Sequence, residues 1–194
     1  MGVKIFYYDL ETTGLDPAKH AIHQLAAFME IDGEIVDRVN IKMAPHPKAA
    51  IEPEALKVAG VTLEELQGRQ DYLQGYAQLI RFLGPHVDRF DRADKIFLCG
   101  YNNAKFDDGF LRMFFELCNN KYFGAYFWSH ALDVMVLAGE YLKHRRAGME
   151  SFKLFRVALE LGLKVEEDNL HDAWYDLELT REVYKIVTGE IPEI

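Results

Sequence analysis

Two carboxylates, Asp9 and Glu11, follow directly after an apolar run at the start of the chain. The run from Val3 to Tyr8 predicts a buried strand, and residues two apart on a strand point to the same face, so its end would place the two acids side by side. Thr12-Thr13-Gly14 then predicts a turn. Neighbouring carboxylates repel each other unless they share protons or cations, and an oxygen-ligated divalent ion such as Mg²⁺ or Mn²⁺ satisfies both. A solvated edge strand would carry such a pair equally well.

Two further polar clusters occur where predicted elements begin or end. An apolar strand at 95–100 is followed by a polar turn, and Asp107 lies at the start of an amphipathic stretch that runs to about Leu117. His171 lies on a predicted loop before Asp176, which opens a segment with apolar residues at helical spacing. With the first pair, the chain supplies four acids and one histidine from strand ends and helix starts. That is where α/β folds place their chemistry.

These three segments resemble the three motifs of the DEDD superfamily, the DnaQ-like 3′→5′ exonucleases. In chain order the matching segments are Asp9-Leu-Glu11-Thr-Thr-Gly14, Asn103-Ala-Lys-Phe106-Asp107 and His171-Asp-Ala-Trp-Tyr-Asp176. The tyrosine form of the family has a tyrosine four residues before the last aspartate, but position 172 is aspartate here. The chain therefore resembles the histidine subclass, and the resemblance spans residues 3 to about 188.

The resemblance also implies roles for the five motif residues. Phosphodiester hydrolysis needs an activated water, neutralised charge on the attacked phosphate and a stabilised leaving oxygen, and two divalent ions can supply all three. The resemblance implies two Mg²⁺ or Mn²⁺ ions, with Asp9 as the bridging ligand. Glu11 and Asp176 would complete the site of one ion, and Asp107 would hold the other. His171 would be the general base, a role that suits an imidazole whose unperturbed pKa is about 6.5.

Residues next to the acids would contact the substrate. The resemblance implies that the 3′-terminal nucleotide of a single-stranded nucleic acid meets backbone groups of the first motif and side chains of the other two. Leu15 lies where the family often places an apolar wedge between the last bases. For Leu15 and Phe106, ordinary core packing is the alternative. The complete set of expected substrate contacts is Leu10, Thr12, Thr13, Gly14, Leu15, Asn103, Phe106 and His171.

The predicted elements give an α/β fold with a mixed central sheet, in which an antiparallel meander and parallel strands are flanked by helices. Asp32-Gly33 between two strands predicts a tight hairpin. This is the ribonuclease-H-like exonuclease arrangement that the resemblance implies, as one domain over 1–194. A fifth strand is expected around 120–131. The other expected strands cover about 3–9, 22–31, 34–43 and 95–100, and the expected helices cover about 53–59, 62–67, 71–89, 107–118, 133–143, 151–161 and 173–188.

Composition is consistent with one domain that has a sizeable core, since 49% of the 194 residues are hydrophobic. No segment approaches the ~20 apolar residues of a membrane span, and no signal-like stretch follows the N-terminus, which favours a cytoplasmic protein. Cys99 and Cys118 are expected to be small buried hydrophobes rather than a disulfide. The net charge of −9 argues against a broad DNA-binding surface, although bound cations would offset part of it. Such a chain suits an enzyme that engages a few terminal nucleotides.

Several other residues have both a functional and a structural interpretation. The basic run from Lys143 to Arg146 would touch phosphates if it overhangs the cleft, but a solvated helix end is slightly favoured. His20 and His23 are expected to be surface or strand-end residues rather than metal ligands. Trp128 and Trp174 are expected to fill core, with base stacking as the alternative. Asp133 and Asp172 are expected to cap helices.

Three functions remain open for the sequence. The favoured one is a metal-dependent 3′→5′ exonuclease that releases nucleoside 5′-monophosphates from single-stranded or frayed DNA, in proofreading, repair or general end trimming. The second is an exoribonuclease of ribonuclease T or oligoribonuclease type, and the third is a non-catalytic nucleic-acid-binding protein. The chain ends at Ile194, soon after the last predicted helix, which favours a free-standing nuclease over a tethered proofreading subunit. Neither a DNA polymerase or repair partner nor an oligomeric state is indicated.

Overall fold

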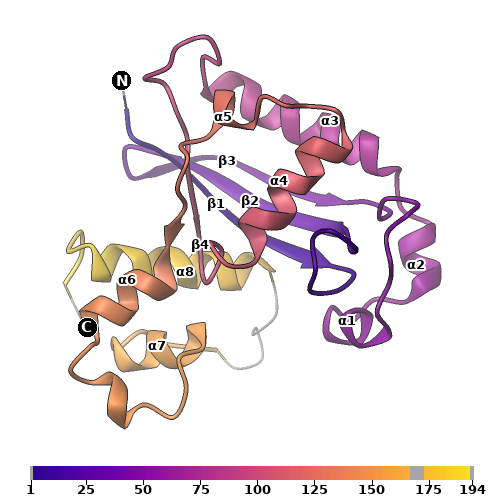
Figure 1. Cartoon of the computed structure of the whole chain (residues 1–194). Helices are drawn as coiled ribbons and strands as arrows, with labels where there is room; N and C mark the ends of the chain where they lie inside the picture. The colour runs from indigo at the N-terminus through magenta and orange to yellow at the C-terminus, as the bar shows by residue number, and fades with distance from the viewer. Residues whose placement is uncertain (1, 167–172, 193–194) are drawn as a thin grey trace.

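A five-stranded sheet forms the centre of the molecule, in the order β3-β2-β1-β4-β5. The computed structural model describes residues 2–166 and 173–192. The strands are β1 (Lys4–Thr12), β2 (Ile22–Ile31), β3 (Glu34–Lys42), β4 (Phe97–Gly100) and β5 (Leu132–Asp133). β1 pairs with β2 and β2 with β3 in antiparallel fashion, whereas β1–β4 and β4–β5 are parallel (Figure 1). The predicted mixed sheet is therefore confirmed.

The hairpin between β2 and β3 is the tight turn that its sequence predicts. Asp32 has φ 51° and Gly33 has φ 85°. A two-residue turn with both φ values positive matches the right-handed twist of the flanking strands, and aspartate followed by glycine is a preferred pair for it. The turn thus sets the register of β2 against β3, in which Ile31 pairs with Glu34.

The fifth strand lies beyond the segment where it was expected. β5 consists of Leu132–Asp133, and Phe123–Tyr126 within the expected range forms the short helix α5. From that range only Phe127 makes a sheet-like contact, an isolated parallel bridge to Ile96. The strand expected around 120–131 therefore forms just past that range, because Phe123 and Tyr126 are buried on one face of a helical turn instead of alternating between two faces of a strand.

Three of the described helices begin at residues whose side chains satisfy the first backbone amides. Thr62 and Asp71 each form a capping box, and Asp133 accepts hydrogen bonds from the amides of Met135 and Val136, as expected of a cap. The helix predicted over 71–89 is shorter, since Pro85 follows Gly84 and the chain continues as a 3₁₀ helix over Gly84–His86. The helices are α1 (Pro53–Val58), α2 (Leu63–Gln67), α3 (Tyr72–Leu83), α4 (Asp107–Leu117), α5, α6 (Val134–Tyr141), α7 (Leu154–Glu160) and α8 (Ala173–Val187), with a second 3₁₀ helix at Arg146–Gly148.

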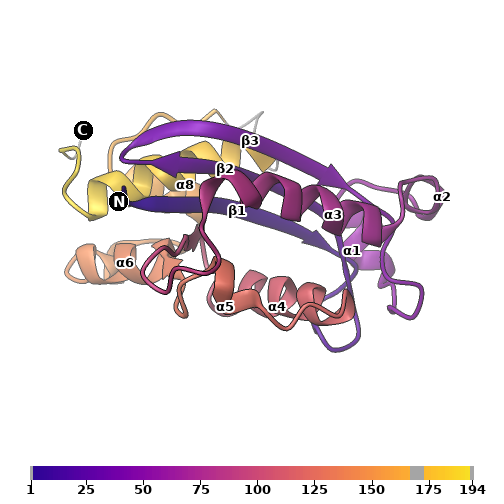
Figure 2. The ribbon, with the colours of Figure 1, turned by 90° about the horizontal axis from the view of Figure 1, so that it is seen from above.

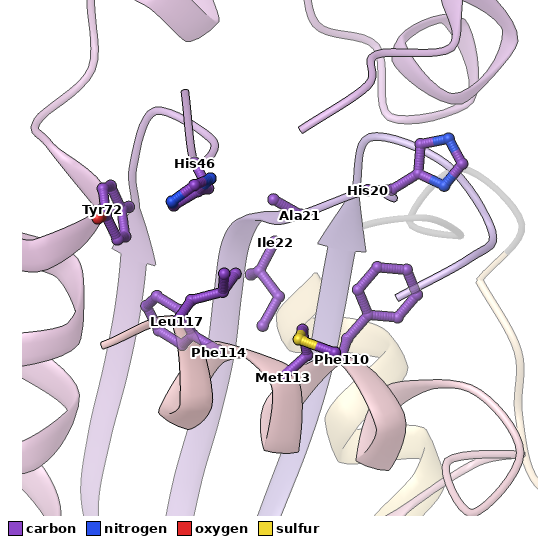
Figure 3. Close-up of a pocket in the computed structure, with 9 residues that line it drawn as sticks. All are labelled: His20, Ala21, Ile22, His46, Tyr72, Phe110, Met113, Phe114 and Leu117. Carbon is purple, nitrogen blue, oxygen red and sulfur yellow. The ribbon is translucent and has the colours of Figure 1, made fainter. Parts of the chain in front are cut away.

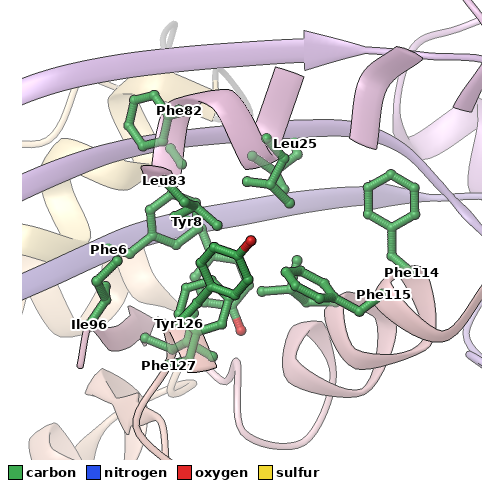
Figure 4. Packing of buried hydrophobic residues seen from close by; sticks show 14 of the residues in the cluster. Phe6, Tyr8, Leu25, Phe82, Leu83, Ile96, Phe114, Phe115, Tyr126 and Phe127 are labelled. Carbon is green, nitrogen blue, oxygen red and sulfur yellow. The ribbon is translucent and has the colours of Figure 1, made fainter. Parts of the chain in front are cut away.

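Alternate residues of β1 face two separate cores. Phe6 and Tyr8 pack with residues of α3, α4 and α5, as Figure 4 shows, whereas Ile5 and Tyr7 pack with residues of α6, α7 and α8. Figure 2 shows α8 on one side of β1 and β2 and α4 on the other. Helices cover both faces of β1, so side chains on both faces are apolar and the apolar run is continuous. Polar side chains can be accommodated only at the last residues of β1.

Three expectations about individual aromatic side chains change with the structure. His20 lies on the loop just before β2 and His23 near the start of β2, but both are buried, so of the two expected positions, surface or strand end, the surface one is wrong. Burial and the guanidinium of Arg69 lower the pKa of His23 to about 4. The side chain of Trp128 is 49% exposed, so it does not fill core. Trp174 is partly buried and packs against the core beneath α8.

The structure bears on the expectations about the two cysteines and about membrane-spanning segments. Cys99 and Cys118 are free thiols, Cys99 being buried and Cys118 partly so. Within residues 2–166 and 173–192, none of the helices combines the length and the apolar character that crossing a membrane requires.

Candidate active site

The end of β1 carries Asp9 and Glu11 past the point where β1 is paired on both sides. Residues 5–7 of β1 pair with β4, whereas Asp9 and Glu11 remain paired only with β2, opposite Ala26 and Gln24. Asp9 and Glu11 share the strand face of Ile5 and Tyr7, which is the face covered by α8. β4 ends at Gly100, and the chain then turns towards the free side of β1.

Asp107 is the first residue of α4 and is buried. The turn that leads to it is organised by Asn103, whose carbonyl oxygen accepts hydrogen bonds from the amides of Phe106 (3.2 Å) and Asp108 (2.9 Å). Gly100 makes this turn fit, because a Cβ there would lie 3.0 Å from both the Cβ of Asn103 and the carbonyl oxygen of Tyr8. The start of a helix favours a negative charge, so the position suits a carboxylate.

Asp176 approaches from the other side of the sheet. It lies in the first turn of α8, a helix that contacts both β1 and β2. The buried side chains of Leu177 and Val183 hold α8 in place within the second core. The charge of Asp176 raises the pKa of Asp9, so the Asp176 side chain lies near the C-terminal end of β1.

Mutual repulsion and burial define the electrostatics of these acids. The pKa of Asp9 rises to about 7 because the group is buried and faces the charges of Glu11 and Asp176. Burial, Asp9 and Glu11 likewise raise the pKa of Asp107 well above its usual range. Hydrogen bonding to the Leu10 backbone lowers both values and offsets part of the shift. The structure therefore brings together the four acids that the sequence singled out.

The donor set of this cluster fits a hard divalent cation. Carboxylate oxygens are the ligands that Mg²⁺ and Mn²⁺ prefer, and a cation would relieve the repulsion that raises the pKa values. Within the described residues, no three acidic, histidine or cysteine side chains already stand at the spacing of a coordination sphere. His171 and Asp172 lie outside the described residues.

A pocket of about 330 Å³ opens next to Glu11, between the end of β1 and α1. Leu10, Thr12, Gly14 and Leu15 form one wall, and residues of α1 form the opposite wall. Leu15 is 77% exposed, which excludes the alternative that it is core. The volume lies within the range of small-molecule sites.

Phe106 and Asn103, both expected in this pocket, differ in their positions. Phe106 lines the pocket and also packs against Phe110 at a ring-centroid distance of 5.0 Å, so it serves the pocket and the core. The side chain of Asn103 is fully buried and is not among the residues that line the pocket. Thr13 is also fully buried, and its hydroxyl donates to the carbonyl oxygen of Ala50 (2.7 Å). Asn103 and Thr13 therefore shape the site from behind.

The wall formed by α1 was not anticipated as part of the site. Val58 is 78% exposed at the pocket, facing the wall that carries Leu15. The other residues contributed by this segment are Glu52, Glu54 and Ala55. A helix start with proline at its first position was recognisable in the sequence, but its placement opposite β1 depends on long-range contacts. An exposed valine on a short helix was the only available signal.

A second crevice lies behind the pocket and is too small for a nucleotide. Its volume is about 10 Å³, close to that of a single water molecule. Figure 3 shows His20 at one end of the crevice and His46 and Tyr72 at the other, with side chains of α4 across from Ile22. The crevice is a packing gap between β2 and α4.

The basic run from Lys143 to Arg146 makes contacts with neighbouring residues on the protein surface. Lys143 Nζ lies 2.5 Å from Glu140 Oε1, Arg145 lies 3.9 Å from Glu160, and Arg146 lies over the ring of Phe152. These contacts agree with the favoured interpretation of this run as a solvated helix end.

Solved structures with the same fold include E. coli exonuclease I in complex with a dT13 oligonucleotide. This structure has a TM-score of 0.75 and 22% identity, and the match covers 96% of this chain and 41% of that one. The zinc-bound form of the E. coli exonuclease I–single-stranded DNA complex has a TM-score of 0.76 and 23% identity, with 99% and 42% covered. The expected exonuclease fold is thereby confirmed.

Curated relatives share sequence as well as fold. The chain is 28% identical to exodeoxyribonuclease I of E. coli K12, over 97% of this chain and 40% of that protein. It is also 28% identical over 176 residues to the PolC-type DNA polymerase III of Thermotoga petrophila, which covers 91% of this chain and 11% of the polymerase. The chain thus spans less than half of the length of these relatives.

A family model also matches most of the chain. The model designated RNase_T and described as an exonuclease matches residues 6–184, a range that contains all three motif segments. Together with the converging acids and the shared fold, this match shows that the chain belongs to the exonuclease family, in the DEDD class of the ribonuclease-H-like superfamily.

Proposed function

We propose that this protein is a metal-dependent 3′→5′ exonuclease that hydrolyses phosphodiester bonds at the 3′ end of single-stranded or frayed DNA and releases nucleoside 5′-monophosphates. One observation carries the proposal. The charges of Glu11 and Asp176 raise the pKa of Asp9, and those of Asp9 and Glu11 raise the pKa of Asp107, beside a nucleotide-sized pocket that Glu11 itself lines. We also propose that residues 1–194 act as one exonuclease domain.

The acidic cluster would hold two divalent ions, Mg²⁺ or Mn²⁺. Asp9 would contribute to both sites, Glu11 and Asp176 to one, and Asp107 to the other. When bound, such ions activate water, neutralise charge on the attacked phosphate and stabilise the leaving oxygen. Because the strand that ends near Asp9 and the helix that starts at Asp107 pack together in the core that contains Phe6 and Tyr8, the protein fixes the separation of the two acids before any ion binds.

The pocket would hold the 3′-terminal nucleotide through apolar contacts. Leu15 and Val58 are exposed on opposite walls, and Phe106 lies between them and the core. Glu11, Glu52 and Glu54 also line the pocket, so a phosphate approaching it without cations would meet negative charge. Substrate binding is therefore expected to depend on divalent cations as strongly as hydrolysis does.

His171 is proposed as the general base that takes the proton from the attacking water. Its chain position, five residues before Asp176, places it on the segment leading into the first turn of α8. A neutral imidazole accepts a proton near neutral pH. A carboxylate of the acidic cluster accepts a proton less readily once cations are bound to it.

The relatives favour DNA over RNA as the substrate. Exodeoxyribonuclease I and the PolC-type DNA polymerase III both carry DNA in their names, and solved structures of exonuclease I contain dT13 and dA16 oligonucleotides. An exoribonuclease, or a protein that binds nucleic acid without cutting it, is an alternative outcome of the experiment below.

The test is a product analysis on matched single-stranded DNA and RNA oligomers in Mg²⁺, Mn²⁺ or EDTA. Chromatography should detect nucleoside 5′-monophosphates from DNA in either metal and none in EDTA. Asp176→Asn should abolish release, while the control Glu178→Gln, on the same helix and paired with Arg38 at 2.9 Å, should not. Products with a 3′-phosphate, or release that persists in EDTA, would contradict the proposal.

A further inference from the structure

His20 is a buried histidine that connects the two walls of the pocket. It lies on the loop between β1 and β2 and is 7% exposed. Its Nδ1 is 3.0 Å from the amide nitrogen of Asp16 in the same loop, and its Nε2 is 3.1 Å from Glu52 Oε1, next to α1. A neutral ring with its proton on Nε2 accepts from the Asp16 amide and donates to Glu52, so both contacts are satisfied at once.

The His20 ring also supports the turn that carries Leu15. A Cβ on Gly14 would lie 2.5 Å from the ring atoms of His20, so the backbone at Gly14 rests directly on the ring. The ring is held by hydrogen bonds at both nitrogens and cannot move aside at low cost. Any displacement of the ring would therefore be transmitted to Gly14 and to its neighbour Leu15.

Backbone hydrogen bonds attach the same loop to the segment before α1. The amide of Glu52 donates to the carbonyl oxygen of Thr13 (2.8 Å), and the amide of Ala50 donates to that of Lys19 (2.8 Å). These bonds fix the segment up to residue 52, where α1 begins. The His20–Glu52 contact is the side-chain link that extends this attachment to the pocket itself, because Glu52 is one of the residues that line it.

We propose that His20 is a positioning residue, whose hydrogen bond to Glu52 sets the separation between Leu15 and Val58 and thereby the seat for the terminal nucleotide. The inference rests on the proposed function, since it assigns the pocket to substrate. A histidine that only filled space would need neither the directional contact to Asp16 nor a partner as exposed as Glu52, whose side chain is 50% exposed. The burial of the ring and its two contacts are what distinguish the two roles.

Two substitutions of His20 separate its contact with Asp16 from its contact with Glu52. His20→Asn retains an acceptor near the place of Nδ1 for the Asp16 amide but is too short to reach Glu52. His20→Gln extends an amide to the place of Nε2 and retains the link to Glu52. Glu52→Ala removes the partner. His86→Asn is the matched control, because His86 is also mostly buried and paired with a carboxylate, Asp37 at 3.3 Å, on β3.

The first readout is amide hydrogen exchange, which does not depend on activity. Exchange over residues 12–20 and 52–58 should accelerate about tenfold in His20→Asn and Glu52→Ala and remain close to wild type in His20→Gln and His86→Asn. Unchanged exchange in His20→Asn, or equal acceleration in His20→Gln, would overturn the proposal. This readout decides the role of His20 even if the wild-type protein hydrolyses no oligomer, an outcome that would refute the proposed function alone.

The second readout is steady-state hydrolysis of a single-stranded DNA oligomer. KM should rise about tenfold in His20→Asn and in Glu52→Ala, with kcat changed by less than about twofold, because the contact affects binding rather than chemistry. The double variant should be no worse than the poorer single variant, since the two changes remove one interaction. Additive effects of the two substitutions, or a fall in kcat with unchanged KM, would overturn the positioning role.

Discussion

The carboxyl of Asp9 at the end of β1 faces the carboxyl of Asp107 at the first residue of α4, and its charge raises the pKa of Asp107. β1 and α4 pack together in the core that contains Phe6 and Tyr8, so the protein maintains this repulsion at a cost in stability. A fold that holds acids close together in this way favours the binding of cations. The predictions below follow from that arrangement and from the pocket beside it.

Asp9→Asn should stabilise the metal-free protein at alkaline pH. The pKa of Asp9 is about 7 in the folded state, above the unperturbed value of 3.8 for an aspartate, so the folded state holds this proton more tightly than the unfolded state. Ionisation of Asp9 therefore destabilises the wild type progressively as pH rises from about 4 to 7, by at most about 4 kcal/mol. Urea unfolding in EDTA should show the variant more stable than wild type at pH 8 and equal to it near pH 4.

Divalent cations should reverse that order. Binding to the folded state alone stabilises by RT ln(1 + [L]/Kd), about 2.7 kcal/mol at a hundredfold excess over Kd, and Asp9→Asn removes a ligand. Glu34→Gln, an exposed substitution on β3, is the control and should show neither effect. A variant that is no more stable than wild type in EDTA at pH 8 would contradict the description of the acidic cluster.

Leu15→Ala and Val58→Ala should weaken substrate binding without unfolding the protein. Both side chains are more than three-quarters exposed, so the free energy of unfolding should change by less than about 0.5 kcal/mol. Loss of about 1 kcal/mol of apolar contact with a base corresponds to a rise in KM of about fivefold for each variant. Phe90→Ala, at a residue that is 90% exposed on a loop away from the pocket, provides the control. Equal KM values for all three variants would show that the pocket does not hold the substrate.

His171→Ala should slow hydrolysis while leaving cation binding in place. Loss of a general base reduces kcat by about 10²–10⁴, whereas the four carboxylates remain available. The measurements are kcat across neutral pH and the rise in Tm on adding Mn²⁺, with His130→Ala, an exposed histidine, as control. A variant with full activity across this range would disprove the assignment of His171 as the base.

Lys143→Ala combined with Arg146→Ala should leave the salt dependence of DNA binding unchanged. Lys143 is paired with Glu140 and Arg146 stacks on Phe152, so neither is committed to a phosphate in this structure. Each lost phosphate contact would reduce the slope of log K against log salt by about 0.7 on single strands. Fluorescence anisotropy at several salt concentrations measures this slope directly, and a smaller slope would assign the run to substrate binding.

The sequence was most informative where local pattern and tertiary environment agree. β1, the hairpin at Asp32 and Gly33 and the start of α4 at Asp107 were predicted because alternation, turn preference and helical spacing are local properties. The strand end at Asp9 and the helix starts near Asp107 and Asp176 could also be placed, since strand ends and helix starts converge in this class of fold. The charges of Glu11 and Asp176 on Asp9, and of Asp9 on Asp107, indicate that the four acids lie near the end of β1.

The sequence was least informative where long-range contacts decide the outcome. β5 is only two residues long. Its pairing with β4 depends on where the chain leaves α5 rather than on the composition of β5 itself. The burial of His20 could not be predicted, because it depends on Gly14 and on the position of Glu52, which come from separate segments. The same is true of Val58, which becomes part of a pocket only when α1 packs opposite β1.

The most direct test of the central claim is a gel time course on matched single-stranded DNA and RNA oligomers labelled at the 5′ end. The reactions contain Mg²⁺, Mn²⁺ or EDTA, and Asp9→Ala serves as the inactive control. The account predicts a ladder that shortens the DNA from its 3′ end, requires metal and is absent with Asp9→Ala. Intact oligomers of both kinds after incubation with metal and folded protein, or the same ladder with Asp9→Ala, would contradict it.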